Sequence, residues 1–260
     1  MKIVVCIKQV PATGAVKRYT DDLRLDRAAA EAIINPLDEY AIEQALRLAD
    51  AGGVDSVTYL SMGPDQAAEA LRRALAMGGD DAVLITDPPL AGADEWVTAR
   101  VLATALDKLA PDVALMGMAS DDARGSLVPG AVAAMRDVPL LSYGAELALG
   151  DGEARVRRLT ATGFDWISAP LPVVATVTDQ VGEPRYASLK GIMAAKRKPM
   201  ETWTLGDMGL SSDDLRGGAL TTVTDARPPE EKPPTERIES VPATEAAVKI
   251  ADWLEQRKLI

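Results

Sequence analysis

The chain has 260 residues, of which 47% are hydrophobic, and carries a net charge of −11 at pH 7. This length accommodates one large domain, or one domain with an appendage. The acidic balance argues against nucleic acid and anionic membrane surfaces as partners, because basic side chains are needed to neutralise phosphate groups. No apolar run reaches the roughly 20 residues of a membrane span, and the N-terminus lacks a signal-peptide pattern. We therefore expect a soluble, cytoplasmic protein without membrane insertion.

Two residue types restrict the chemistry available to the chain. It contains no His, which excludes imidazole acid–base catalysis, Ser-His-Asp triads and His-bound metals. The single Cys, Cys6, lies in an apolar run, so we expect neither an internal disulfide nor a reactive thiolate. We therefore predict no metal site and no catalytic acid, base or nucleophile, and any reaction would depend on a bound cofactor.

Strand and helix patterns alternate through the N-terminal half. The predicted strands are 2–10, 54–60, 81–86 and 112–116, and the predicted helices are 39–49, 66–77 and 95–109. Elements of this length joined by short loops are typical of a parallel α/β sheet with right-handed crossovers. The chain has no Gly-x-Gly-x-x-Gly and no phosphate-loop Gly-Lys-Ser, so neither a standard dinucleotide loop nor a triphosphate loop is predicted.

The stretch from Val113 to Met135 combines a strand, a polar loop and a helix of small residues. In a parallel sheet such a loop lies at the carboxyl edge of the strands, where main-chain N–H groups at a helix N-terminus bind phosphate or carboxylate. An ordinary turn is the alternative, because Asp, Ser and Gly also serve turn geometry. The segments expected at this edge, and therefore candidates for one pocket, are 8–13, 35–36, 61–64, 86–89 and 117–126.

The pattern changes in the C-terminal half. Strands are predicted at 140–149, 154–161 and 173–177, with a turn at Gly150-Asp151-Gly152 between the first two. Gly163 breaks the chain before the third strand. We expect these strands to extend the sheet with antiparallel edges.

The last third of the chain contains three segments of distinct composition. Residues 183–199 are basic and predict a solvated loop with a short helix. The Pro- and Glu-rich stretch 227–234 cannot form a compact core by itself and predicts a linker. Residues 243–257 carry apolar side chains at helical spacing, and such a terminal helix needs a surface to cover, on this chain or on a partner.

Four groups of residues resemble the β subunit of electron-transfer flavoprotein, and together they extend over essentially the whole chain. They are VCIKQVP at 5–11, NPLDEYAIE at 35–43, GP and RALAMG at 63–64 and 73–78, and EPRYASLKGIMAAK at 183–196. The last group corresponds to the family's recognition loop and is the most specific. The resemblance implies a Rossmann-like, doubly wound, mostly parallel sheet of the adenine-nucleotide α-hydrolase type, with antiparallel edge strands and a C-terminal arm.

The resemblance also implies an electron carrier. In this family the β subunit forms a heterodimer with an α subunit, and a flavin adenine dinucleotide (FAD) lies at the interface, held mostly by the α subunit. Electrons pass from flavin dehydrogenases, such as the acyl-CoA dehydrogenases of fatty acid oxidation, toward a quinone oxidoreductase. The alternative from another class is a nucleotide-binding regulatory protein that has the same sheet and no redox role.

The resemblance assigns ligand and partner residues by position. The family's β subunit binds an adenosine monophosphate (AMP) in a pocket of its own. The matching pocket residues are Cys6, Asn35, Pro36, Leu37, Asp38, Met62, Gly117, Asp121, Asp122, Ala123, Arg124, Gly125, Ser126, Leu127 and Val128. Pro11, Ala12 and Thr13 match the flavin-facing loop, and Leu189 matches the leucine that docks into partner dehydrogenases.

The resemblance also implies two parts. Residues 1–200 are expected to form a nucleotide-binding α/β domain that includes the recognition loop at 183–199. Residues 201–260 are expected to form an extended arm with a helix that packs on the α subunit. The expected arm therefore begins directly after the basic segment.

The phosphate loop departs from the family pattern. That pattern often reads Ala-Ile-Asp-Gly-Asp-Thr-Ala-Gln-Val-Gly-Pro, whereas residues 119–129 read Ala-Ser-Asp-Asp-Ala-Arg-Gly-Ser-Leu-Val-Pro. Ala123 and Arg124 replace an Asp and a Thr. We predict that Arg124 supplies the cation for the nucleotide phosphate and that Ser126 caps the following helix. The alternatives are a changed nucleotide or an empty pocket, with Arg124 as a solvated side chain beside the Asp residues.

Residues 91–98 (AGADEWVT) partly resemble the family branch that bifurcates electrons. In that branch a second FAD occupies the place of the AMP. Glu95 stands where the branch motif has Thr, so the match is incomplete. We therefore expect AMP in this pocket, with a second FAD as the alternative.

Overall fold

The computed structural model describes residues 1–216, 219–227 and 235–260. The chain forms two compact units, Met1–Thr224 and Asp225–Ile260. Of the linker predicted at 227–234, all but Arg227 lies outside the described residues. No helix within the described ranges is long and apolar enough to cross a membrane.

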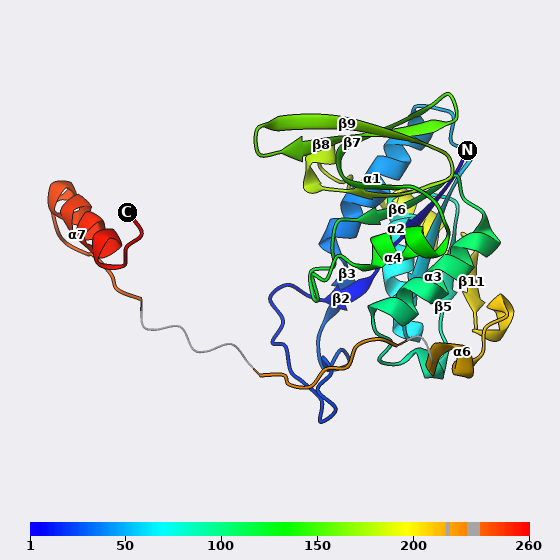
Figure 1. Cartoon of the computed structure of the whole chain (residues 1–260), viewed down its shortest axis with the longest axis horizontal. Coiled ribbons are helices and arrows are strands. Elements are labelled where there is room, and N and C mark those ends of the chain that lie inside the picture. Colours follow the sequence, from blue (N-terminus) through cyan, green and yellow to red (C-terminus); the bar gives the residue numbers. More distant parts are fainter. Residues whose placement is uncertain (217–218, 228–234) are drawn as a thin grey trace. The chain divides into compact units, whose positions relative to one another are not determined.

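A nine-stranded sheet forms the centre of the first unit, with the strand order β11-β5-β4-β1-β6-β10-β7-β8-β9 (Figure 1). The strands are β1 (Lys2–Cys6), β4 (Ser56–Met62), β5 (Asp81–Ile85), β6 (Val113–Gly117), β7 (Leu140–Gly150), β8 (Glu153–Thr160), β9 (Gly163–Pro170), β10 (Val173–Val177) and β11 (Met200–Trp203). All neighbours from β11 to β7 are parallel, whereas β8 and β9 pair antiparallel. The mostly parallel α/β sheet with an antiparallel edge is confirmed.

Helices cover both faces of the sheet. The α-helices are α1 (Pro36–Asp50), α2 (Ala68–Met77), α3 (Glu95–Leu109), α4 (Val128–Met135), α5 (Leu189–Ala195), α6 (Ser212–Arg216) and α7 (Ala243–Gln256). The 3-10 helices are η1 (Asp65–Ala67), η2 (Pro88–Leu90), η3 (Asp179–Val181) and η4 (Gly206–Met208). Alternate residues of β1 point to opposite faces: Ile3 packs in one core cluster with α1 and α2, and Val4 packs in the other with α3 and α4. The sheet is therefore doubly wound, as predicted.

The strand order reverses at β1. From β1 the chain continues outward through β4 and β5, and it then returns to the other side of β1 with β6 and β10. The carboxyl ends of β1 and β6 therefore lie next to each other at a topological switch point. In open α/β sheets ligands bind in the crevice at this point.

The strand predicted at 2–10 is interrupted. β1 ends at Cys6, and β2 (Gln9–Pro11) pairs antiparallel with β3 (Ala32–Ile34) in a separate two-stranded sheet. The break occurs because the start of α1 provides the partners of Lys8: its N–H donates to the Asp38 carboxylate, and its carbonyl accepts from the Asn35 N–H. A β-branched run alone does not reveal that competition.

Two further differences concern the C-terminal strands. β7 pairs antiparallel with β8, as expected, but β10 lies in the interior of the sheet, parallel to both β6 and β7, and is buried along its whole length. Gly163 does not break the chain but begins β9, which pairs with β8. Most of β9 is exposed, so its sequence lacks the apolar alternation that predicts a strand.

The first unit extends further along the chain than the composition indicates. β11 pairs with β5, and Trp203, Leu205 and Leu215 are buried in the core. Residues 201–216 and 219–224, which we assigned to the arm, thus belong to the first unit.

Candidate functional site

The candidate site lies at the switch point, where α1 begins beside the loop that follows β6. Asn35 precedes α1 and is buried. Its side-chain Nδ2 donates to the Ala119 carbonyl (2.9 Å), and its Oδ1 accepts from the Asp121 N–H (3.0 Å). The Asn35 side chain therefore connects the start of α1 to the loop, and it provides hydrogen-bond partners for two main-chain groups of the loop.

Asp38 and Gly117 are in direct contact below this loop. The Asp38 carboxylate is buried and accepts from the Lys8 N–H (2.8 Å). A Cβ at Gly117 would lie 2.5 Å from Asp38 Oδ1 and 2.6 Å from the Leu37 carbonyl oxygen, so only glycine fits here. Burial raises the pKa of Asp38 to about 7, which makes its charge sensitive to pH near neutrality.

Cys6 and Met62 end β1 and β4, which follow β6 in this order on one side of it in the sheet. Burial, and then the negative charge of Asp38, raise the pKa of the Cys6 thiol to about 12. The thiol therefore remains protonated at neutral pH, which is unfavourable for a nucleophile. Met62 is half-buried at the end of β4 and packs against the α3 side of the core. Both side chains therefore contribute apolar surface to this region and no reactive group.

Asp122 lies between two cations. Its side chain is only 1% exposed, and it accepts from Lys8 Nζ (2.9 Å) and Arg27 Nη2 (2.5 Å). Burial acts to raise the pKa of Asp122, but the charges and hydrogen bonds of Lys8 and Arg27 outweigh it and hold the pKa well below its usual range. Arg27 lies in the long loop between β2 and β3, where no motif points to it, so sequence reasoning missed it.

Arg124 is exposed and pairs with Asp121 (3.0 Å). Arg124 and Ser126 both adopt a left-handed backbone, with φ of 51° and 53°, which is uncommon for residues other than glycine. Ser126 does not cap α4, contrary to our prediction. Its hydroxyl donates backward to the Met118 carbonyl (3.1 Å), and α4 begins at Val128 without a side-chain cap.

The residues predicted to face the flavin, 11–13, border the same loop. The Thr13 hydroxyl donates to the Asp121 carboxylate (3.2 Å), and the Ala12 N–H donates to the Glu31 carbonyl (2.8 Å). Pro11 ends β2. The fold thus brings 11–13 and 121–124 together, although they are more than 100 residues apart in sequence.

Asp94, from the motif at 91–98, uses both of its carboxylate oxygens. Oδ1 accepts from the Val97 N–H (2.9 Å) and caps α3. Oδ2 accepts from the Leu220 N–H (2.8 Å), the Thr221 N–H (3.0 Å) and the Thr221 hydroxyl (3.1 Å). Burial acts to raise the pKa of Asp94, but these hydrogen bonds outweigh it and lower the pKa. Nothing in the sequence indicated the contact with residues 220–221.

Two cavities in the described part of the chain are not lined by residues 121–128. The larger, about 930 Å³, opens between α1, α2 and residues 183–196. The second, about 370 Å³, lies beside β7 and β8. Its lining residues are Met118, Tyr143, Arg158, Leu159, Thr178, Asp179 and Gln180.

The segment with Leu189 presents apolar side chains to solvent. We call residues 183–196 the docking segment, after the docking role predicted for Leu189; it contains α5, capped by the Ser188 hydroxyl. Leu189 is 84% exposed, and Ile192 and Met193, three and four positions later, are exposed on the same helix face. A Cβ at Gly191 would lie 2.3 Å from the Ala76 carbonyl oxygen, so the opposite face of α5 packs closely on α2.

Comparisons with known proteins agree with this architecture. A family model described as the electron transfer flavoprotein domain matches residues 22–208. The electron transfer flavoprotein subunit beta of Mycobacterium tuberculosis is 36% identical over 265 residues, covering 99% of both chains. Subunit CarD of the caffeyl-CoA reductase-Etf complex of Acetobacterium woodii is 34% identical over 262 residues, covering 100% of both. The subunit beta of Megasphaera elsdenii is 36% identical over 234 residues, covering 87% of this chain and 86% of its own. The chain therefore belongs to the electron transfer flavoprotein β-subunit family.

Proposed function

We propose that this chain forms a heterodimer with an electron-transfer flavoprotein α subunit and carries electrons from flavin dehydrogenases of the acyl-CoA dehydrogenase type toward a quinone oxidoreductase. The observation that carries the proposal is the docking segment, where a chain of this family exposes an apolar helix face. Exposed apolar side chains on a rigid support are typical of binding hot spots.

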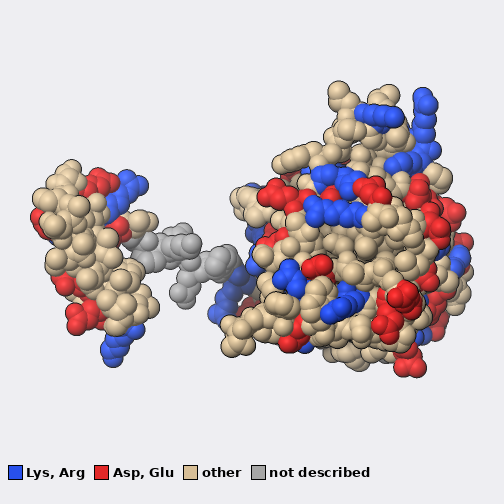
Figure 2. All heavy atoms as spheres, turned by 90° about the horizontal axis from the view of Figure 1, so that it is seen from above, with Lys and Arg blue, Asp and Glu red and all other residues tan. Residues whose placement is uncertain are grey.

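Figure 2 shows basic and acidic side chains next to each other on one face of the first unit, so neither sign dominates there. The proposal places dehydrogenase recognition on the apolar side chains of α5, because these side chains are exposed.

The flavin would lie between the subunits, against residues 11–13. When bound, FAD supplies the one- and two-electron chemistry. The residues of this chain orient the cofactor and restrict its contact with solvent, and the contact between Thr13 and Asp121 fixes the loop that faces it.

We further propose AMP in the switch-point pocket. Asn35, Gly117 and the loop that follows β6 form a cradle whose close backbone approach suits a nucleotide. Lys8 and Arg27 are cations suited to a phosphate, and at present both pair with Asp122. A phosphate therefore competes with the chain's own carboxylate for these two side chains.

A second FAD in this pocket is the runner-up. It draws support from the motif at 91–98 and from the similarity to CarD, whose name places it in a caffeyl-CoA reductase-Etf complex. The engagement of Asp94 weighs against it, because both carboxylate oxygens already accept hydrogen bonds from α3 and from residues 220–221.

Coexpression with the α subunit tests the proposal. We expect a yellow heterodimer, and mass spectrometry of the small molecules released on denaturation should find one FAD and one AMP. Two FAD molecules would favour the bifurcating alternative, and one FAD alone would mean that the loop has lost its nucleotide. A colourless, self-sufficient monomer would overturn the electron-carrier proposal in favour of a regulatory nucleotide-binding protein.

Leu189→Ala tests the docking segment directly. Truncation of an exposed apolar hot spot costs about 2 kcal/mol of binding, so we expect slower electron transfer from the dehydrogenase with an unchanged flavin spectrum. Leu159→Ala, at an exposed leucine of β8 outside the docking segment, is the matched control. An unaltered transfer rate in Leu189→Ala would show that the residue is incidental.

A further inference from the structure

The docking segment is fixed at both ends while its middle is exposed. At its end, Arg72 Nη1 donates to the carbonyls of Ala195 (2.6 Å) and Lys198 (3.0 Å). Lys198 Nζ in turn donates to the Leu75 carbonyl (2.8 Å) in α2. These contacts hold the C-terminal end of α5 on α2.

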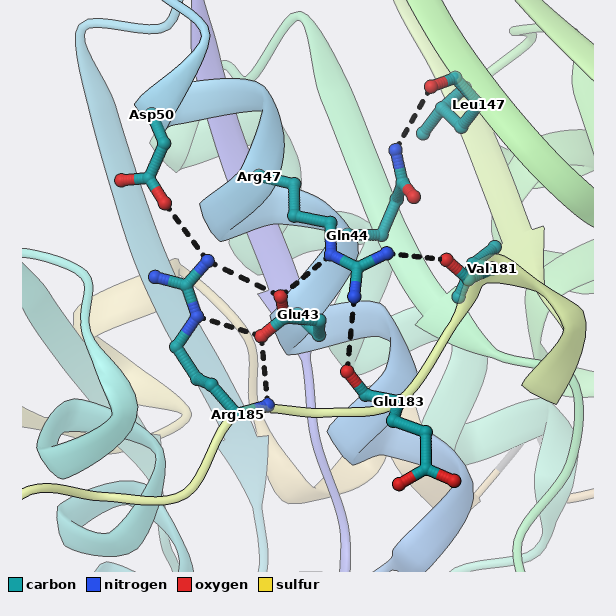
Figure 3. A network of polar contacts seen from close by, with 8 residues as sticks. All are labelled: Glu43, Gln44, Arg47, Asp50, Leu147, Val181, Glu183 and Arg185. Carbon is teal, nitrogen blue, oxygen red and sulfur yellow. Dashed lines mark hydrogen bonds and ion pairs between the residues drawn. The ribbon is translucent and has the colours of Figure 1, made fainter.

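At its beginning, the docking segment is held by α1 through Glu43 (Figure 3). The buried Glu43 carboxylate accepts from the Arg185 N–H (3.0 Å), from Arg185 Nε (2.7 Å) and from Arg47 Nε (2.7 Å). Arg47 also donates to the carbonyls of Val181 (2.8 Å) and Glu183 (3.1 Å). Main chain and side chains on both sides of residue 182 therefore bind one helix.

The charges in this network compensate one another. Burial acts to raise the pKa of Glu43, but hydrogen bonds from Arg185 and Arg47 outweigh it and lower the pKa. The bond to Glu43, followed by the one to Asp50, raises the pKa of Arg185. Removing one partner would leave a buried charge without compensation, so the network has one favoured arrangement. Asp50, which is largely exposed, contributes at the periphery.

We infer that Glu43 is a positioning residue for dehydrogenase docking: with Arg47 and Arg185 it orders residues 181–188, and these set the place of Leu189. The inference rests on the proposed function of the docking segment. Its physical basis is preorganisation, because a segment that is ordered before binding loses less conformational entropy when the partner binds. Within the described residues, the hydrogen bonds of Glu43, Arg47 and Arg185 do not involve residues 11–13, so we place the effect of the network on docking rather than on cofactor chemistry.

The test uses the heterodimer with Glu43→Gln, which removes the charge and keeps the shape. Arg185→Gln is the second variant, because it leaves the Arg185 N–H bond to Glu43 intact. Asp107→Asn is the matched control, since it removes the ion pair with Arg136, which lies between α3 and α4. Hydrogen exchange is measured in residues 181–188. Electron transfer is measured with an acyl-CoA dehydrogenase, chosen from a panel as the enzyme that reduces the wild-type heterodimer fastest.

For Glu43→Gln and Arg185→Gln we expect faster exchange in 181–188 and a rise of about fivefold or more in the KM for the heterodimer as electron acceptor, at unchanged kcat and flavin spectrum. A merely structural role would lower the yield of folded protein and leave KM alone. Wild-type exchange and KM in both variants would overturn the inference. If Leu189→Ala has no effect on transfer, the proposed docking function fails, whereas the exchange result still decides whether Glu43 orders the segment.

Discussion

Asp38 is a buried carboxyl group whose charge changes near neutral pH. In an unfolded chain the pKa of Asp is about 3.9, whereas burial raises it to about 7 in the folded protein. Because the folded pKa is the higher one, the stability contributed by this group is fully present below about pH 4 and is lost as the pH rises through 7. We expect that loss to reach at most about 4 kcal/mol.

Asp38→Asn tests this expectation, because the amide retains an oxygen for the Lys8 N–H and does not titrate. Urea unfolding at pH 5 and pH 8 should show a steeper loss of stability with pH in the wild type than in the variant. A difference between wild type and variant that is equal at both pH values would contradict the expected titration.

Arg124 and Asp122 should affect nucleotide binding in opposite directions. Arg124→Ala removes an exposed cation of the loop, and we expect lower AMP occupancy of the purified heterodimer.

Asp122→Asn releases Lys8 and Arg27 from a competing carboxylate, and we expect higher AMP occupancy. Chromatography of the nucleotide released on denaturation measures the AMP occupancy of each variant. Wild-type occupancy in Arg124→Ala would leave that residue as a surface ion pair of little energetic value.

At the scale of single elements, Asp94 links α3 to the chain that follows α6. Asp94→Ala removes both the helix cap and the contacts to residues 220–221, and we expect a loss of about 1 to 2 kcal/mol in the free energy of unfolding. Asp94→Asn separates the two roles, because Asn is a good cap but its amide nitrogen cannot accept from the Leu220 and Thr221 N–H groups.

Hydrogen exchange of residues 219–224 gives the second measurement. Both variants should exchange faster in this segment, while Asp94→Asn should keep nearly the wild-type stability. Equal stability losses in the two variants would show that the contacts to 220–221, and not the cap, carry the energy.

The elements that could be predicted are those with strong local signals. Asp94 before an apolar helical pattern predicted α3, and the apolar run at 112–116 predicted β6. β9 and β11 escaped prediction because they are edge strands of the sheet, and an exposed strand needs little apolar periodicity. The interruption of the first strand at Lys8 depends on Asp38, 30 residues away, so no local pattern contains it.

The same distinction applies to the site. The proximity of the start of α1 to the loop after β6 could be predicted from the sequence. The carboxyl ends of parallel strands share one edge of an α/β sheet, and both segments were expected there. The partners within the site followed from long-range packing instead. Arg27 reaches Asp122 across 95 residues of sequence, and Leu220 reaches Asp94 across 126. Such pairs have no signature in a single chain.

At the scale of the whole molecule, the C-terminal unit is the part with the least burial of its own. None of the residues of α7 is buried, and its apolar side chains include Val248, Ile250 and Trp253. We propose that α7 covers its apolar face with the α subunit.

Deletion of Pro242–Ile260 tests this assignment. We expect weaker heterodimerisation, measured by sedimentation at decreasing concentration, while circular dichroism shows that the sheet of the first unit remains folded. Val248→Ala in the full chain is the milder variant. A truncated chain that assembles with unchanged affinity would disprove the assignment.

The ion pair between Glu43 and Arg185 has an evolutionary consequence. The two residues lie 142 positions apart in sequence, and loss of either one alone leaves the other at a cost in stability. Selection should therefore retain or discard them together. Family members that no longer bind a dehydrogenase should lack both the glutamate and the arginine. At the position of Leu189 they should carry polar residues. The pair would then serve as a record, readable in any descendant sequence, of whether the lineage still exchanges electrons with a docked partner.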